Sequence, residues 1–182
     1  MEEKWAHRAE LAEAAINERH AHSVWGLPRT NLAVVSWPPT TKEKLFVHWH
    51  YWWQAQYLDC QVDAALRRGT KTRRRRIADT LRGIQRRNRG KLTANLHYDD
   101  KAWLALALTR AETLPKFGAI RGRNELIQNI FDGVDSLTGV LPWRTNENFY
   151  NVPTNGPAAI LAARVGELEL SEHLVDWVFD NL

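Results

Sequence analysis

The chain has 182 residues, of which 44% are hydrophobic and 25% are charged, and its formal net charge is +4. Such a chain can bury one sizeable core, which favours one globular domain over residues 1–182 and excludes a disordered or fibrous protein. With a single cysteine, Cys60, an internal disulfide is excluded. No leader peptide is visible and no apolar run approaches the roughly 20 residues of a membrane helix, so we predict a cytoplasmic protein without a membrane partner.

The first half of the chain predicts two helices separated by a long loop. Residues 2–22 are rich in helix formers, and Pro28 and Pro38-Pro39 then interrupt the chain. The second helix is expected over about 43–67 and is unusually aromatic, with residues 46, 49, 53 and 57 on one face. An aromatic stripe of this kind fits either a buried core or the wall of a sugar-binding cleft.

The third predicted helix, residues 72–88, lies in the basic part of the chain. Residues 67–91 contain 12 of the 25 Lys and Arg and one acid, Asp79, leaving 13 basic and 20 acidic residues elsewhere. A nucleic-acid surface and a solvated helix face are both possible readings. Ile77, Leu81 and Ile84 keep an amphipathic spacing, and the segment has no aromatic residue to stack on a base. These features favour the solvated face, so no nucleic-acid partner is expected.

The fourth predicted helix, residues 98–113, begins with two adjacent carboxylates, Asp99 and Asp100, and continues as a run that is apolar nearly all round. One Asp at a helix start is explained by capping and by the helix dipole. A second carboxylate at the N-terminus of a buried helix must be solvated, be paired with another polar group, or have a function of its own. The pair is therefore a candidate site, with the alternative that one Asp caps the helix while the other is solvated.

The remainder of the chain predicts three more helices, at about 124–137, 158–165 and 172–181. Asn155 is expected to cap the second of these and Gly166 to end it, and Ser171 is expected to cap the third. Residues 138–154 form a long interrupted segment that is a candidate functional loop. No alternating strand pattern is present, so the chain is predicted to be all-α, with seven helices. The fourth and sixth helices should be an inner layer packed between amphipathic neighbours.

Other arrangements that could carry chemistry are weak. Cys60 lies among aromatic residues on a predicted helix and is interpreted as a small core residue instead of a nucleophile. His48 and His50 are two residues apart, which on a helix places them on different faces and gives no metal-binding spacing. No phosphate-binding glycine loop is present.

Three sequence blocks follow one another along the chain: residues 46–55 (FVHWHYWWQA), residues 98–103 (YDDKAW), and residues 139–143 (GVLPW) with 151–157 (NVPTNGP). In this order they resemble glycoside hydrolase family 76, the endo-α-1,6-mannanases and their bacterial relatives. The resemblance covers most of the chain from about residue 40. It implies an (α/α) six-hairpin barrel with the Asp pair at the bottom of a cleft.

The resemblance also implies a glycosidase acting on α-1,6-linked mannan or a related α-glycan, with Asp99 as nucleophile and Asp100 as general acid/base. Adjacent carboxylates readily reach the gap of about 5 to 5.5 Å that a retaining mechanism uses, although the residues alone do not order the two roles. Pyranose faces would come from Trp53, Tyr98 and Trp143, and hydroxyl partners from Asn151 and Asn155. Neither a metal nor an organic cofactor is implied.

A six-hairpin barrel has twelve helices and this chain offers seven, so it resembles the N-terminal half of a family 76 domain, an incomplete toroid. Exposed inner helices would then favour self-association. Two alternatives to an active hydrolase remain open. One is a truncated, non-catalytic remnant that binds carbohydrate, and the other is a helical nucleic-acid-binding protein that uses residues 67–91.

Overall fold

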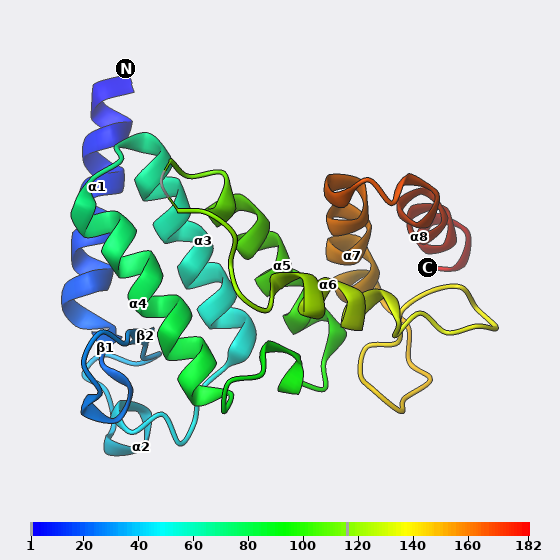
Figure 1. Ribbon diagram of the computed structural model, residues 1–182, viewed down its shortest axis with the longest axis horizontal. Coiled ribbons are helices and arrows are strands. Elements are labelled where there is room, and N and C mark those ends of the chain that lie inside the picture. Colours follow the sequence, from blue (N-terminus) through cyan, green and yellow to red (C-terminus); the bar gives the residue numbers. More distant parts are fainter. Residues whose placement is uncertain (1, 116) are drawn as a thin grey trace. The chain divides into compact units, whose positions relative to one another are not determined.

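The structure is a computed structural model that describes residues 2–115 and 117–182. Its helices and strands are labelled in Figure 1. The chain divides into two compact units. The first unit comprises residues 1–90 with 113–118, and the second comprises residues 91–112 with 119–182.

The first unit consists of a long N-terminal helix, a small two-stranded sheet and a pair of packed helices. Its elements are α1 (Glu2–Arg19), β1 (Ala21–His22), the 3-10 helix η1 (Val24–Gly26), β2 (Leu32–Ala33), α2 (Thr41–Lys44), α3 (Tyr51–Arg67) and α4 (Lys71–Arg87). The strands are antiparallel, with His22 opposite Leu32. Helices α3 and α4 pack together around fully buried aliphatic side chains that include Leu58, Val62 and Ile77.

One glycine permits α4 to lie close to the loop before β2. A Cβ added at Gly83 would come within 2.3 Å of the carbonyl oxygen of Asn31, so no other residue fits there without a backbone shift. The side chain of Asn31 then donates hydrogen bonds to Tyr57 and Thr80. This loop is thereby joined to both α3 and α4.

The second unit is built around α5 (Tyr98–Glu112), which packs against α6 (Arg123–Phe131) and α7 (Val152–Val165), while α7 packs against α8 (Leu168–Asn181). The short 3-10 helix η2 (Leu92–Ala94) precedes α5. Leu104, Leu108 and Leu161 are fully buried. The two segments predicted to be apolar inner helices, α5 and α7, pack against each other in this unit. Most of α5 is buried, whereas α7 leaves Val152 49% and Ile160 47% exposed.

The predicted second helix is interrupted near its start, between Lys44 and Tyr51. Thr40 caps the short α2 through a reciprocal capping box with Glu43, and the chain leaves the helix at Leu45. Phe46 has a φ of +50° and is buried, and α3 begins only after His50. Phe46 and Trp49 thus lie outside the helix, so the predicted one-faced aromatic stripe does not form.

Several other boundaries differ from the prediction. The fifth helix ends at Phe131 instead of about 137. Helix α7 is capped by Asn151 instead of Asn155, and α8 begins at Leu168, before the predicted cap Ser171, whose hydroxyl donates to Ala159 O. Gly166 ends α7 as predicted, in the left-handed conformation. The described residues contain eight α-helices, with α2 as the addition, and one small sheet, so the all-α class is confirmed.

No helix within residues 2–115 and 117–182 combines the length and the apolar character that crossing a membrane requires.

Candidate active site

The two adjacent aspartates lie in the first turn of α5, where negative charge is favoured by the helix dipole. Both side chains are partly exposed. Asp99 Oδ1 accepts a hydrogen bond of 2.8 Å from the backbone nitrogen of Asp100, one of the N–H groups that the helix itself leaves unpaired. One oxygen of Asp99 therefore satisfies a first-turn N–H from inside the helix and not from the N-cap position, and its Oδ2 accepts from another partner.

Each carboxylate also has its own neutral donor. The indole Nε1 of Trp143 donates to Asp99 Oδ2 at 3.1 Å, and the amide nitrogen of Asn95 donates to Asp100 Oδ2 at 2.6 Å. Asn95 Oδ1 in turn accepts a hydrogen bond from the backbone nitrogen of His97 at 3.0 Å. Asn95 was not predicted as a site residue. The signal available in the sequence was its position in a short polar loop directly before the Asp pair.

Aromatic rings surround the donor to Asp99. The ring of His97 lies 4.8 Å from that of Trp143 at an interplanar angle of 57°, and Phe149 meets Trp143 edge-on at 6.2 Å. Backbone hydrogen bonds from Tyr98 N to Trp143 O and from Trp143 N to Phe149 O hold the loop against the start of α5. Trp143 is partly exposed and Phe149 is exposed. An apolar ring face thus lies beside an ionisable carboxylate, a combination that many ligand-binding sites use.

Tyr98 is enclosed by protein. A Cβ on Gly133 would lie 2.3 Å from the Tyr98 ring, and the Lys101 ammonium lies 3.8 Å from the centre of that ring. Lys101 is 2% exposed and donates to Asn129 Oδ1 at 2.9 Å, and burial lowers the pKa of its ammonium to about 8. This enclosure fits an anchoring role for Tyr98 better than the sugar-stacking role predicted from the sequence. Lys101 was also missed, although a lysine inside an apolar run was a visible signal.

The two predicted asparagines occupy different positions on α7. Asn155 is fully buried, and its amide accepts from Leu141 N at 2.9 Å and donates to Leu141 O at 3.0 Å and Asn151 O at 3.1 Å. The polar atoms of Asn155 thus hold the loop that leads to Trp143. Asn151 caps α7 by accepting from Thr154 N at 3.0 Å, and its side chain is partly exposed.

Solved structures match this fold over almost the entire chain. The GH76A α-1,6-mannanase of Salegentibacter sp. HEL1_6 matches with a TM-score of 0.77 and 25% identity, covering 98% of this chain and 52% of the mannanase. The chain has the fold of a family 76 glycoside hydrolase. It spans about half the length of the mannanase, and its fold is part of that family's all-α barrel. The family resemblance predicted from the three sequence blocks is confirmed at the level of structure.

Two further structures match equally well. An inactive variant of the same mannanase, in which two consecutive aspartates are replaced by asparagine, was solved with α-1,6-mannotriose and matches with a TM-score of 0.77 and 24% identity over 98% of this chain and 52% of that one. A Listeria innocua protein matches with a TM-score of 0.77 and 23% identity over 98% and 53%. No family profile matches the sequence, and no curated protein matches it significantly.

Trp53, the remaining predicted sugar-binding residue, belongs to the first unit. It lies near the start of α3, is 37% exposed, and has its ring 4.9 Å from that of His50. Its side chain lines a groove of about 440 Å³ along α1 and α3, together with residues that include Ile16, Val34 and Tyr57. The Asp pair does not line this groove. Trp53 therefore provides an accessible indole on the first unit.

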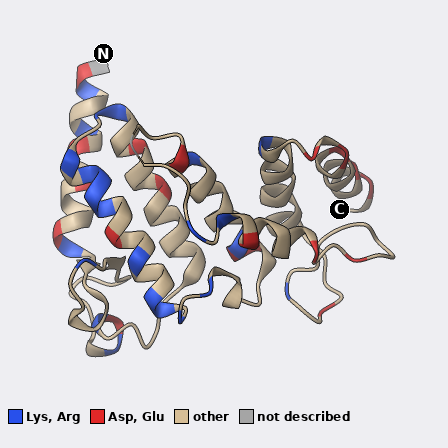
Figure 2. Ribbon diagram, viewed as in Figure 1, with Lys and Arg blue, Asp and Glu red and all other residues tan. Residues whose placement is uncertain are grey.

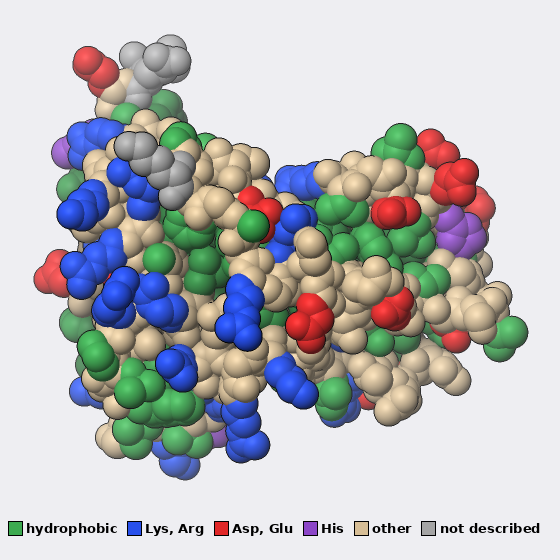
Figure 3. Space-filling view, viewed as in Figure 1, with side chains coloured by type: hydrophobic (Ala, Val, Ile, Leu, Met, Phe, Trp, Pro, Cys, Tyr) green, Lys and Arg blue, Asp and Glu red, His purple; other side chains and the backbone are tan. Residues whose placement is uncertain are grey.

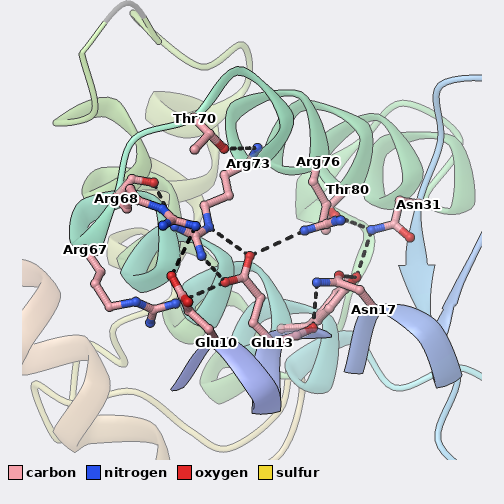
Figure 4. Close-up of polar contacts among 11 residues, drawn as sticks. Glu10, Glu13, Asn17, Asn31, Arg67, Arg68, Thr70, Arg73, Arg76 and Thr80 are labelled. Atoms are coloured by element: carbon pink, nitrogen blue, oxygen red, sulfur yellow. Dashed lines mark hydrogen bonds and ion pairs between the residues drawn. The ribbon is translucent and has the colours of Figure 1, made fainter. Parts of the chain in front are cut away.

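Part of the basic segment joins helices of the first unit. Figure 4 shows the carboxylate of Glu13 on α1 facing the guanidinium groups of Arg67, Arg73 and Arg76. Arg73 is only 8% exposed and makes two hydrogen bonds to Glu13, at 2.9 and 2.5 Å. The predicted solvated face is therefore wrong for Arg73, because this guanidinium is buried as the partner of a carboxylate from another helix.

The predicted core position of Cys60 is also wrong. Cys60 is exposed on α3, where it lines the groove beside α1. His48 and His50 precede α3 instead of lying on it, since the helix begins at Tyr51. Within the part of the chain that the structure describes, no group of three or more His, Cys, Asp or Glu side chains could hold a metal ion.

Proposed function

We propose that this chain carries the catalytic carboxylates of a retaining glycosidase for α-1,6-linked mannan or a related α-glycan. The observation that supports this proposal most is the pair Asp99 and Asp100 at the start of α5, with the Trp143 indole donating to Asp99. The fold is that of an α-1,6-mannanase, and a variant of that mannanase altered at two consecutive aspartates is inactive.

In the proposed reaction Asp99 attacks the anomeric carbon while the bond to the leaving oxygen breaks. Asp100 transfers its proton to that oxygen, so that a glycosyl ester of Asp99 and a free hydroxyl are formed. Asp100 then removes a proton from water, which attacks the anomeric carbon and releases Asp99. The hydrogen bond from Trp143 supports the nucleophilic role of Asp99 because a neutral N–H donor stabilises an anion without neutralising it.

Sugar recognition is proposed to use the exposed part of the same surface. Trp143 and Phe149 offer ring faces to a pyranose, and the partly exposed Asn151 is retained as a hydroxyl partner. Asn155, whose amide is occupied by the backbone, is proposed to position the loop and not to contact the sugar. Trp53 is retained as a second stacking surface, in the first unit.

The proposal is tested by incubating the protein with α-1,6-mannotriose and α-1,6-mannan and measuring released sugar. Asp99→Asn and Asp100→Asn should each abolish most of the hydrolysis, while Asp176→Asn on the exposed side of α8 should not. A mannoside with a good leaving group needs no proton, so it should restore glycosyl transfer to Asp100→Asn, and added azide should then restore turnover. Asp99→Asn should stay inactive under both conditions.

Full activity of Asp100→Asn on mannan would contradict the proposal, as would unfolding of both variants, because the pair would then be a structural helix start. A rise in melting temperature with mannotriose and no released sugar would instead identify a non-catalytic carbohydrate-binding remnant. The single chain gives no support for self-association through exposed inner helices, and this expectation and the cytoplasmic location stay predictions.

A further inference from the structure

Two loops of the first unit present apolar side chains to solvent next to each other. The indole Nε1 of Trp25, in η1, donates to the carbonyl oxygen of Leu45, just after α2, at 2.8 Å. Around this contact Trp25 is 51% exposed, Leu27 39%, Leu45 50% and Val47 58%. We call these four residues the apolar patch. Exposed apolar side chains gathered in this way are typical of a binding surface, whereas scattered ones need no explanation.

The backbone of both loops is fixed by hydrogen bonds. Leu27 N donates to Val24 O at 2.9 Å, and Val47 N donates to Lys42 O at 3.0 Å. Phe46, between Leu45 and Val47, has a φ of +50° and is only 1% exposed. Because Phe46 points into the core, its two neighbours are held outward. The apolar patch is therefore preformed, and binding through it does not require the loops to become ordered first.

Cationic side chains border the apolar patch. Lys42 and Lys44 are exposed on α2, directly before the loop that carries Leu45 and Val47. Arg29 is exposed just after η1, in the loop that carries Leu27. Two α4 side chains attach that helix to the same loops, since Arg82 Nε donates to Arg29 O at 2.7 Å and Arg87 Nε donates to Phe46 O at 2.9 Å. The exposed Arg86 and Arg89 flank this end of α4.

The acids in these segments are already bound. Glu43 accepts hydrogen bonds from Ser36 and Thr40, and Asp79 is paired with Arg82.

Figure 2 shows blue residues along α4 and on α2, and Figure 3 shows hydrophobic side chains gathered over the β1–β2 and α2 region with Lys and Arg beside them. This face is thus apolar at its centre and cationic around it.

We propose that this face binds the surface of an anionic lipid bilayer. Trp and aliphatic side chains at loop tips enter the boundary between headgroups and acyl chains, and Lys and Arg are attracted to anionic headgroups. A nucleic acid fits less well, because Trp25 is the one ring among the four patch residues, the other three are aliphatic, and interfaces with nucleic acids are strongly polar. The inference stands independently of mannan hydrolysis, since none of the groups around α5 takes part.

The test is co-sedimentation of the protein with vesicles of phosphatidylcholine alone and of phosphatidylcholine with about 30% phosphatidylglycerol. Binding should be seen with the anionic vesicles and should weaken as salt is raised. Val47→Glu should abolish it, whereas the matched control Leu137→Glu, at a 94% exposed position of the second unit, should bind as the unaltered protein does. Each surface cation contributes about fivefold, so Lys42→Gln with Lys44→Gln should weaken binding by about 25-fold.

Trp25 supplies a second readout that does not depend on a charge change. Lipids brominated on their acyl chains should quench part of the tryptophan fluorescence, and Trp25→Phe should remove that part. The proposal would be overturned if the protein bound neutral and anionic vesicles equally well, or if Leu137→Glu lost as much vesicle binding as Val47→Glu. Absence of any quenching by the brominated lipids would also overturn it. Displacement of bound protein by single-stranded oligo(dT) would also overturn it, in favour of a nucleic-acid surface. Leu45→Ser, a milder change in the same patch, replaces Val47→Glu if the latter does not fold.

Discussion

The indole Nε1 of Trp143 donates a hydrogen bond to Asp99 Oδ2 at 3.1 Å, joining the loop before α7 to the start of α5. The two residues are 44 positions apart in the chain. The loop is held in place independently, since Tyr98 N donates to Trp143 O and Asn155 binds Leu141. The loop therefore holds the Trp143 N–H, a neutral donor, against Asp99. The adjacent carboxylate, Asp100, has a different donor, Asn95.

Trp143→Phe should lower kcat/KM on α-1,6-mannan by about 10- to 100-fold, because a hydrogen bond to a charged group is worth about 1.5 to 3 kcal/mol and the smaller phenyl ring has no N–H to donate. The measurement is initial rates of released sugar. Trp5→Phe, at a 60% exposed position on α1, is the matched control and should leave the rate unchanged. An unaltered rate in Trp143→Phe would show that the indole N–H does not assist Asp99.

Gly133→Ala should destabilise the protein by about 2 kcal/mol or more, because the added methyl group would lie 2.3 to 2.5 Å from atoms of the enclosed Tyr98 ring. Urea unfolding gives the change in free energy. Gly156→Ala is the control, since a Cβ at this helical position meets nothing closer than 4.0 Å and should be neutral or stabilising by up to about 1 kcal/mol. Similar stabilities for the two variants would contradict the close packing of Tyr98 on Gly133.

Lys101 should make the stability of the protein rise between about pH 8 and pH 10.5. Burial lowers the pKa of its ammonium from 10.5 to about 8, so over this range the unfolded chain holds a proton that the folded chain has released. Below the folded pKa both states are protonated and the cost of burying the charge, roughly 3 kcal/mol, is fully present. Urea unfolding at pH 7.5 and 10 measures the rise, which Lys101→Met should remove. Lys71→Met, at an exposed position, should retain it.

Glu13→Gln should cost about 3 kcal/mol of unfolding free energy at pH 7, because it removes the carboxylate that pairs with the buried Arg73. Burial of Glu13 opposes ionisation, but hydrogen bonds and charges of Arg73, Arg67 and Arg76 outweigh it and lower the pKa of the carboxyl below 4.5. A depressed folded pKa contributes stability that is present above 4.5 and is lost as the pH falls through the folded value. The difference between the variant and the unaltered protein should therefore shrink as the pH falls below 4.5.

Glu10→Gln provides the comparison for this change. Glu10 pairs with Arg68 at 3.2 Å, but the Arg68 side chain is 67% exposed, so this ion pair should contribute less than about 1 kcal/mol. Equal losses in the two variants would mean that Glu13 acts only as one more exposed charge and that its arginine cluster does not hold α1 against α4.

The sequence by itself determined the helical class, the approximate position of the helices that surround α5, and the Asp pair at its start. These features depend on local properties: apolar residues at helical spacing, Gly166 as a helix end, and acids in a first turn. The resemblance to family 76 also followed from the sequence, because its three blocks are short continuous segments in a fixed order.

Only the tertiary structure decided which polar groups meet. Trp143 is hydrogen-bonded to Asp99, 44 residues away in the chain, and Arg73 to Glu13, 60 residues away. The side-chain amide of Asn155 is hydrogen-bonded to the backbone of Leu141. None of these partners has a spacing that a helix or strand imposes, so no periodicity in the sequence encodes them. The same holds for Phe46, whose helical spacing with Trp53 and Tyr57 is overridden by a capping box at Thr40 and by burial of its ring outside the helix.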